Sequence, residues 1–298
     1  MSTRLKFAVL GSPVAHSLSP RLHEAAYKHL GLDFEYSAIE VDEDGFAPFI
    51  NSLDDSWRGF SVTMPLKKIA YELAFRRDEL AKKLEVANTF YRAGCEVSAP
   101  VAEANKTGSE ANSIHWHASN TDIAGIMGAL KGITPERVLL LGSGATAKNC
   151  VYALSILSAE KVVIATRNQV SAAEIASEFN SEKFSVEAVQ LSDVSVADNF
   201  DLVINTIPGN PEPFLNPVGS LFEVIYNPWP TKLAALWSGA NHPVIPGIDM
   251  LIHQAVAQVA IFASENSEKW NQALVPEITE VMALVVNRDF NLPWSKNF

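Results

Sequence analysis

Short runs of consecutive apolar residues alternate along the chain with segments in which apolar residues recur every three or four positions. Runs such as Lys6–Leu10 and Arg137–Leu141 have the length and composition of buried strands. Segments such as Pro20–Leu30, with Gly31 as a stop signal, have the apolar spacing of a helix that covers a sheet. Strands that alternate with helices predict an α/β fold with parallel sheets and right-handed crossover connections.

The same patterns place further elements along the chain. The other predicted strands are Phe34–Val41, Gly59–Thr63, Val86–Arg92, Ser113–Ala118, Lys161–Thr166, Asp201–Asn205, Phe222–Tyr226 and Pro243–Ile245. The other predicted helices are Phe46–Leu53, Pro65–Ala74, Asp122–Leu130, one that ends at Phe179, Ile248–Ser264 and Pro276–Val286. From Cys95 to Asn112 small and polar residues replace the pattern, which predicts a long hairpin loop between two strands.

Charge and cysteine content narrow the classes of partner. The formal net charge of −11 disfavours nucleic acid and acidic membranes as partners, although a few local donors can still hold a small anionic substrate. The two cysteines, Cys95 and Cys150, lie far apart and belong to no CxxC pair, so we predict neither a disulfide framework nor a zinc site. No apolar run reaches the roughly 18–20 residues of a membrane span, and the first residues lack a signal-peptide pattern. We therefore predict a cytoplasmic protein with no membrane partner.

Two histidines that flank Trp116 raise the question of a metal. His115 and His117 are alternate residues of a predicted strand, so their side chains share a face on which a metal pair is conceivable. No third ligand is evident, and we favour the interpretation of exposed strand histidines. No metal is predicted.

A glycine-rich turn follows the strand Arg137–Leu141 and opens a helix. Its sequence, Gly142-Ser143-Gly144-Ala145-Thr146-Ala147, is the GxGxxA form of the dinucleotide-binding fingerprint in the required strand–turn–helix context. The glycines permit a tight turn and a close approach of the backbone to a pyrophosphate, which the helix N-terminus stabilises. A purely structural turn is the alternative, and the context favours nucleotide binding.

The end of the next strand distinguishes the two nicotinamide dinucleotides. An NAD site usually has an acidic residue there to bind the ribose 2′-hydroxyl. In this chain the strand ends Thr166-Arg167-Asn168, without an acid, and Arg167 offers planar donors to a 2′-phosphate. We predict NADP rather than NAD, with a solvated loop arginine as the alternative.

These signals predict two domains in a chain of 298 residues. We expect an N-terminal α/β substrate-binding and catalytic domain over residues 1–124 and a Rossmann-type NADP-binding domain over residues 125–247. The C-terminal helices, within residues 248–298, are expected to pack back on the first domain.

Three polar clusters in the first 125 residues are candidates for chemistry. Ser17 and Ser19 are a possible carboxylate clamp, although Ser19 alone is also an ordinary helix N-cap. Lys67 lies in the first turn of a predicted helix, where the helix dipole disfavours a cation, and this local cost favours a functional role. Lys68 beside it is the expected solvated neighbour. Asp122 opens another helix, where a simple first-turn acid is an equally good interpretation.

Eight ordered segments resemble the shikimate dehydrogenase family over about Phe7 to Glu265. They are GSPVAHSLSP, SVTMPLK, ANT at 87–89, NTDIAG, GSGATA, NTIP at 205–208, YNP at 226–228 and GIDMLIHQA. The resemblance implies the reversible reduction of 3-dehydroshikimate to shikimate with NADPH, without a metal, in aromatic amino-acid biosynthesis. The protein is then a monomer or homodimer that acts on a small molecule.

The resemblance also implies a role for each matching residue. Lys67 and Asp122 are the implied catalytic pair. Ser17 and Ser19 are implied to bind the substrate carboxylate, and the ring hydroxyls are implied to contact Thr63, Asn88, Tyr226 and Gln254. The implied cofactor residues are Gly142, Ser143, Gly144, Ala145, Thr146, Ala147 and Arg167, with Thr206, Ile207, Gly247 and Met250 near the nicotinamide.

The chain departs from the usual family pattern at several positions, and rival functions remain. Ser61 stands in place of a common Asn, and Ser171 in place of a basic residue that often helps to bind the 2′-phosphate. Ala145, Thr166 and Pro246 are milder departures. The rivals are a quinate or quinate/shikimate dehydrogenase, against which Ser19 argues mildly, a non-catalytic NADP-binding regulator and, more distantly, a metal-dependent hydrolase.

Overall fold

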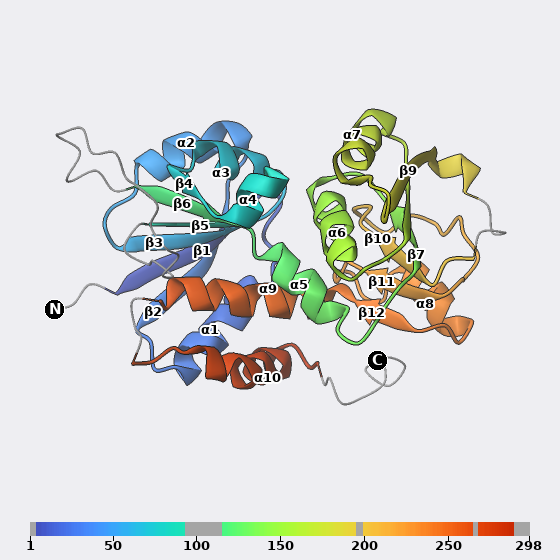
Figure 1. Ribbon diagram of the computed structural model, residues 1–298. Helices are drawn as coiled ribbons and strands as arrows, with labels where there is room; N and C mark the ends of the chain where they lie inside the picture. Colours follow the sequence, from blue (N-terminus) through green and yellow to red (C-terminus); the bar gives the residue numbers. More distant parts are fainter. Residues whose placement is uncertain (1–3, 93–114, 195–198, 265–267, 289–298) are drawn as a thin grey trace. The chain divides into compact units, whose positions relative to one another are not determined.

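Two units, each built around its own six-stranded sheet, make up the computed structural model of the chain (Figure 1). The structure describes residues 4–92, 115–194, 199–264 and 268–288. The first unit takes in the chain up to Thr121 together with Ala255–Arg288, and the second takes in Asp122–Gln254. The boundary near the C-terminus falls within one helix, α9 (Gly247–Phe262).

The sheet of the first unit is mixed. Its strand order is β2-β1-β3-β5-β6-β4, in which β1, β2 and β3 are parallel and β5 is antiparallel to both β3 and β6. The strands are β1 (Leu5–Gly11), β2 (Phe34–Glu40), β3 (Trp57–Val62), β4 (Arg76–Arg77), β5 (Thr89–Arg92) and β6 (Trp116–Ser119). The helices are α1 (Ser19–His29), α2 (Glu43–Asn51), α3 (Lys67–Leu73), α4 (Glu79–Leu84) and α10 (Val275–Val285), with a 3-10 turn η2 (Gln272–Leu274).

Both faces of this sheet are packed, because successive strand residues point to opposite sides. Ala8 and Leu10 of β1 belong to a core with Phe46, Phe60 and other apolar side chains. On the other face the Phe7 ring lies 4.9 Å from that of Phe262 and 5.8 Å from that of Tyr27, measured between centroids. Helix α10 packs on α1. The expectation that C-terminal helices complete the first unit is therefore confirmed.

The sheet of the second unit is parallel throughout. Its strand order is β12-β11-β10-β7-β8-β9. From β7 the chain adds β8 and β9 on one side and then β10, β11 and β12 on the other, which is the topology of a dinucleotide-binding fold. The strands are β7 (Arg137–Leu141), β8 (Lys161–Thr166), β9 (Ser185–Gln190), β10 (Leu202–Asn205), β11 (Ser220–Glu223) and β12 (Val244–Pro246). The helices are α5 (Asp122–Ala129), α6 (Ala145–Ile156), α7 (Gln169–Phe179), α8 (Lys232–Gly239) and the first half of α9, with a 3-10 turn η1 (Leu191–Asp193).

Alternate residues of β7 show why this sheet is buried on both faces. Val138 and Leu140 belong to one apolar cluster, while Leu139 and Leu141 belong to another on the opposite side. A strand covered on both faces reads as an unbroken apolar run, as RVLLL does. No helix among the described residues is long and apolar enough to cross a membrane.

Some sequence-based expectations need correction. The expected parallel pairing is wrong for β5, which runs antiparallel to β3, whereas the antiparallel pairing of β5 with β6 agrees with the expected hairpin. The pattern missed β4, α4 and α8, which are short. Strand β11 ends at Glu223 rather than at Tyr226, because the Glu223 carboxylate accepts a hydrogen bond from the Ile225 amide and the chain turns there. The loop expected over 95–112 lies outside the described residues.

Candidate active site

The candidate substrate residues of the first unit lie along one edge of its sheet. Strands β1 and β3 are parallel, so the segments that follow them, which carry Ser17 and Ser19 and then Thr63 and Lys67, leave from the same edge. Strand β5 runs the other way, which brings Asn88, just before its start, to that edge. Backbone hydrogen bonds join the three segments: the Thr63 amide donates to the Leu10 carbonyl at 2.9 Å, and the Val62 amide donates to the Asn88 carbonyl at 2.7 Å.

Ser17 and Ser19 differ in their surroundings. Ser19 is the first residue of α1 and only 4% exposed, whereas Ser17 is half-buried and accepts a hydrogen bond from the Ser19 amide at 3.2 Å. The helix N-cap is Leu18, without a side-chain cap. The interpretation of Ser19 as an ordinary N-cap is thus wrong.

Lys67 is the first residue of α3, as the sequence predicted. Its side chain is half-buried, and its carbonyl accepts a hydrogen bond from the Ala87 amide at 3.0 Å, which joins the start of α3 to the segment that leads to Asn88. Lys68 is exposed, with its ammonium 3.9 Å from the Glu72 carboxylate one turn along the helix. The two neighbouring lysines therefore occupy different environments.

Gly11 permits the close approach of β1 to the segment that leads into α3. A Cβ at this position would lie 2.4 Å from Thr63 Cγ2 and 2.8 Å from the Met64 carbonyl oxygen. Real Cβ atoms essentially never come so close to backbone atoms. The Gly11 position therefore determines where Thr63 and, through the same segment, Lys67 lie.

We expect Gly11→Ala to displace this segment and lower kcat/KM for the acid substrate at least tenfold. Overpacking of this kind typically costs about 1–3 kcal/mol of stability as well. Gly239→Ala, in α8, is the matched control, because a Cβ there meets no atom within 4 Å and should leave activity unchanged. Steady-state kinetics and thermal melts check both variants. Wild-type kinetics in Gly11→Ala would show that the close approach is not needed.

Asp122, the first residue of α5 in the second unit, is 4% exposed. Its Oδ2 accepts a hydrogen bond from Nδ2 of the fully buried Asn149, on α6, at 2.9 Å. The preceding residue, Thr121, donates its amide to Asn88 Oδ1 at 2.7 Å. Asn149 thus holds the carboxylate of Asp122 in place, and no sequence motif pointed to it.

The glycine-rich turn of the second unit has the geometry of a phosphate cradle. Gly142 has φ +105°, which an L side chain rarely adopts, and its Cβ would lie 2.6 Å from Thr206 Oγ1. Gly144 is the N-cap of α6, and the space beside it is open. Ala147 is fully buried beneath the helix. Amides at the start of α6, among them those of Ala145 and Thr146, are the donors such a site offers to an anion.

Arg167 follows β8 and is exposed. Across the described part of the chain no hydrogen bond or ion pair engages its guanidinium group. The Ser171 hydroxyl instead donates to the Ser143 carbonyl at 2.7 Å, and Ser143 Oγ lies 3.2 Å from Thr166 Oγ1. Ser171 and Thr166, two departures from the usual pattern, therefore brace the glycine-rich turn.

Buried Glu223, at the end of β11, organises two loops that carry candidate residues. Its carboxylate accepts hydrogen bonds from Asn205 Nδ2 at 2.9 and 3.1 Å, from Thr231 Oγ1 at 2.8 Å and from the Ile225 amide at 3.2 Å. Burial raises the pKa of this carboxyl, and the hydrogen bonds oppose the shift. Thr206 and Ile207 directly follow Asn205, and half-buried Tyr226 follows Ile225.

The start of α9 holds the remaining candidates. Gly247 is buried so tightly that a Cβ would lie 1.9 Å from the Val224 carbonyl oxygen. Met250 is 6% exposed and packs on Gly125 within the core of the second unit. Gln254 is 6% exposed and donates to the Leu251 carbonyl at 2.9 Å.

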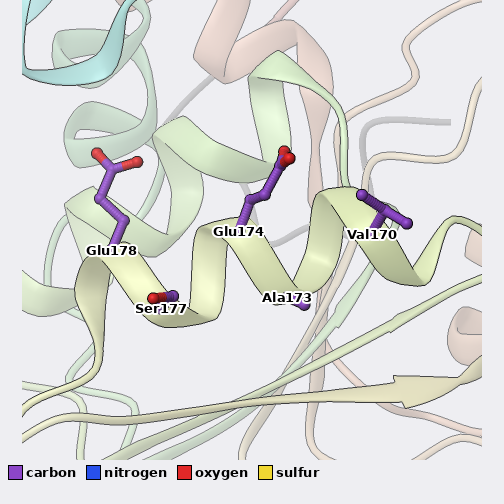
Figure 2. A pocket seen from close by; sticks show the side chains of 5 residues that line it. All are labelled: Val170, Ala173, Glu174, Ser177 and Glu178. Atoms are coloured by element: carbon purple, nitrogen blue, oxygen red, sulfur yellow. The ribbon is translucent and has the colours of Figure 1, made fainter.

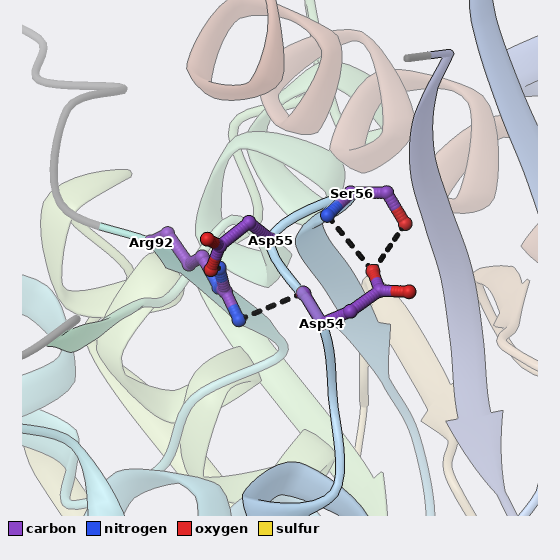
Figure 3. A network of polar contacts seen from close by, with 4 residues as sticks. All are labelled: Asp54, Asp55, Ser56 and Arg92. Atoms are coloured by element: carbon purple, nitrogen blue, oxygen red, sulfur yellow. Dashed lines mark hydrogen bonds and ion pairs between the residues drawn. The ribbon is translucent and has the colours of Figure 1, made fainter.

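A surface hollow and a polar network lie elsewhere in the structure, and neither includes a candidate site residue. A shallow hollow on the surface of α7 is lined by Val170, Ala173, Glu174, Ser177 and Glu178 (Figure 2). Glu178 forms an ion pair with Lys148 at 2.8 Å, and none of the lining side chains is basic. In the first unit, Arg92 pairs with Asp55 at 2.9 Å and donates to the Asp54 carbonyl, which joins β5 to the turn before β3 (Figure 3).

His115 and His117, which the sequence places on one face of a strand, each contact an aromatic ring. His115 stacks on Phe75 with 3.9 Å between ring centroids, and His117 makes an edge contact with Tyr91. His117 is 7% exposed and His115 is half-buried, so the expectation that both are exposed is wrong. Within the described ranges no three His, Cys, Asp or Glu side chains lie close enough to hold a metal ion.

Comparisons with known proteins agree with the topology and the motifs. Residues 9–90 match the shikimate dehydrogenase substrate binding domain, and residues 127–216 match the shikimate / quinate 5-dehydrogenase family. A shikimate dehydrogenase (NADP(+)) of Prochlorococcus marinus is 29% identical over 286 residues, which cover 89% of this chain and 94% of the relative.

Two solved structures extend the comparison. Shikimate dehydrogenase of Mycobacterium tuberculosis superposes with a TM-score of 0.76 at 33% identity, covering 94% of this chain and 99% of the other. Shikimate 5-dehydrogenase of Thermus thermophilus, in complex with NADP(H) and shikimate, gives a TM-score of 0.72 at 25% identity, with the same coverage.

Proposed function

The chain belongs to the shikimate dehydrogenase family of oxidoreductases, and we propose that it catalyses the reversible NADPH-dependent reduction of 3-dehydroshikimate to shikimate. The observation that carries this proposal is the grouping of Ser17, Ser19, Thr63, Lys67 and Asn88 at one sheet edge. The second unit by itself carries a phosphate cradle and a buried aspartate, Asp122.

The proposed domain roles follow the two matches. Residues 1–124, with the helices of 248–298, bind the substrate, and residues 125–247 bind NADP. The match of residues 9–90 to a substrate binding domain supports the first assignment. The parallel sheet of the second unit, with the glycine turn after β7, supports the other.

The residues of the second unit fit NADP. The positive φ of Gly142 and the open space beside Gly144 suit a pyrophosphate that approaches the start of α6. No acidic residue follows β8 to bind a ribose hydroxyl, and Arg167 there is exposed. Thr206, Ile207, Gly247 and Met250 are proposed near the nicotinamide, which supplies the hydride when the cofactor is bound.

The proposed chemistry assigns Lys67 and Asp122 to proton handling. When the ketone carbon gains a hydride, negative charge develops on its oxygen, and Lys67 stabilises that charge and gives the oxygen a proton. Asp122, held by Asn149, aligns the same hydroxyl or the lysine. Ser17 and Ser19 bind the carboxylate, while Thr63, Asn88, Tyr226 and Gln254 position the ring hydroxyls.

One assay tests the proposal against its rivals. The absorbance of the reduced nicotinamide is followed with shikimate or quinate, each offered with NADP or NAD. We expect the fastest turnover with shikimate and NADP. Preference for quinate would identify the quinate branch, which the second family match also covers. The absence of turnover in all four combinations would identify a binding protein on the same scaffold.

Ser17→Ala and Ser19→Ala are each expected to raise KM for shikimate roughly tenfold or more. A hydrogen bond from a hydroxyl to a desolvated carboxylate contributes about 1.5–3 kcal/mol, and each variant loses one. The methyl ester of shikimate, which lacks the negative charge, should lose much less. Unchanged KM for shikimate in both variants would show that the carboxylate binds elsewhere.

We also propose a cytoplasmic location and a monomeric or homodimeric state. The buried free thiol of Cys150 is compatible with a reducing compartment. Size-exclusion chromatography with light scattering distinguishes the two assemblies. A stable tetramer would contradict this part of the proposal.

A further inference from the structure

The side chain of Gln258 lies at the centre of a buried polar network in the first unit. It is fully buried on the second half of α9. Its Oε1 accepts a hydrogen bond from Ser61 Oγ at 2.6 Å and lies 3.2 Å from His23 Nε2. Its Nε2 donates to the Asn88 carbonyl at 3.0 Å and to Thr89 Oγ1 at 3.1 Å. A single amide therefore uses both its donor and its acceptor capacity.

The orientation of this amide follows from its partners. The carbonyl oxygen of Asn88 can only accept, so the atom that faces it must be the nitrogen of Gln258. The opposite atom is then an oxygen, which requires His23 Nε2 to carry a proton. Burial lowers the pKa of His23 to about 3, so the ring is neutral and its Nδ1 accepts from the Tyr27 hydroxyl, 3.2 Å away.

On one side the network leads to Ser19. Because Ser61 donates its proton to Gln258, it must accept from the Tyr36 hydroxyl, which lies 2.5 Å away. The Tyr36 ring stacks on His23 with 4.1 Å between centroids. Burial raises the pKa of Tyr36, while hydrogen bonds with Ser61 and Ser19 lower it, so the phenol stays protonated. The Ser19 hydroxyl bonds to the same phenol, so Tyr36 fixes where that hydroxyl lies, while the single Ser19 proton is the one that a substrate carboxylate would take.

On the other side the network leads to Asn88. Thr89 Oγ1 accepts from Gln258 and donates its proton to Asn88 Oδ1 at 3.0 Å. The same oxygen accepts the Thr121 amide, and Asn88 Nδ2 donates to Thr121 Oγ1 at 2.9 Å. The Thr121 amide, which can only donate, fixes which end of the Asn88 side chain is the oxygen, and Thr89, held by Gln258, gives that oxygen a second donor.

We propose that Gln258 is a positioning residue that couples the carboxylate-binding and hydroxyl-binding halves of the substrate site. It acts on Ser19 through Ser61 and Tyr36, and on Asn88 through Thr89. The ligand that such a site fits is a ring carrying both a carboxylate and hydroxyls, so the inference rests on the proposed function. Ser61, at a position where Asn is common, is the partner that the Gln258 oxygen requires.

Gln258→Met tests the proposal, because methionine has a similar length but no strong donor or acceptor. We expect KM for shikimate to rise about tenfold or more, while KM for NADP stays within about twofold. Met282→Ala, at a fully buried position on α10 whose side chain makes none of the hydrogen bonds of the network, is the control. It should lower the melting temperature and leave both KM values unchanged.

Two milder variants separate the halves and serve if Gln258→Met does not fold. Ser61→Ala should raise KM for shikimate in the wild-type background and add nothing in a Ser19→Ala background, because it acts through Ser19. Thr89→Val acts through Asn88 and should raise KM by the same factor in both backgrounds. Full additivity of Ser61→Ala with Ser19→Ala would overturn the coupling.

The remaining outcomes distinguish this inference from the proposed function. If the wild type turns over shikimate but Gln258→Met and Ser61→Ala keep the wild-type KM, Gln258 has only a structural role. The inference is then wrong, and the proposed function is unaffected. An equal rise of KM for shikimate and for NADP has the same meaning. If the wild type turns over neither acid with either cofactor, the proposed function fails and the coupling falls with it.

Discussion

Lys67→Ala is expected to lower kcat by roughly 10²–10⁴, which is the usual effect of losing a positioned acid or base. The lysine opens α3 with its side chain half-buried, at the sheet edge that also carries Thr63 and Asn88. Binding of shikimate should change much less than turnover, because the interaction is strongest when charge develops on the oxygen. Stopped-flow turnover and equilibrium binding of shikimate measure the two effects separately.

Neighbouring substitutions define the specificity of that effect. Lys68→Ala is the matched control and should be close to neutral, since its exposed ammonium lies 3.9 Å from the Glu72 carboxylate and pairs with no other residue in the described ranges. Lys67→Arg should restore little, because a guanidinium keeps the charge but does not exchange a proton near neutral pH. Retention of more than about half of wild-type kcat in Lys67→Ala, or loss of turnover in Lys68→Ala, would contradict the assignment.

Arg167→Ala is expected to raise KM for NADP by about 100-fold, which corresponds to the loss of two charge-assisted hydrogen bonds to a phosphate. Any activity with NAD should stay nearly unchanged, because NAD lacks the 2′-phosphate. Folding should be unaffected, since the side chain is exposed and engages none of the described residues.

The two cofactors, assayed side by side, provide the internal control for Arg167. Equal losses with NADP and NAD would mean that the arginine supports the loop rather than the phosphate. A wild-type enzyme that already prefers NAD would overturn the proposed cofactor. Arg137→Ala, in which a guanidinium bonded to the Asn199 carbonyl is removed, is a matched arginine control that should not discriminate between them.

Sequence patterns predicted the second unit better than the first, for a physical reason. Strands β7 and β8 have the expected bounds, because a strand buried on both faces leaves an unbroken apolar run. The antiparallel pairing of β5 with β3 depends on which strands become neighbours in the sheet, and local pattern does not contain that information. Helix α4 has only six residues, although its Asp78 N-cap, which accepts from Ala81 N, is a recognisable start signal.

The candidate site shows the same division. Short motifs identified Lys67 and Ser19, and in the structure both follow strands that end at one edge of the sheet, while their roles stay predictions. No sequence motif identifies the residues that hold Ser19 and Asp122 in place, because their hydrogen-bond partners are distant in sequence. Gln258 and Ser61 are 197 positions apart, and Asn149 lies 27 positions from Asp122. Hydrogen-bond networks of this kind become visible only when the chain is folded.

The hydrogen bond from Ser171 to the Ser143 carbonyl constrains how cofactor selectivity can evolve in this lineage. A change of Ser171 to arginine adds a phosphate donor and removes the brace of the glycine turn in the same step, so the gain in affinity is offset. Val170, next to it on α7, is 71% exposed and holds no such bond. A basic residue acquired at position 170 leaves this hydrogen bond intact, but Glu174, one turn further along α7, lines the same hollow and would pair with it.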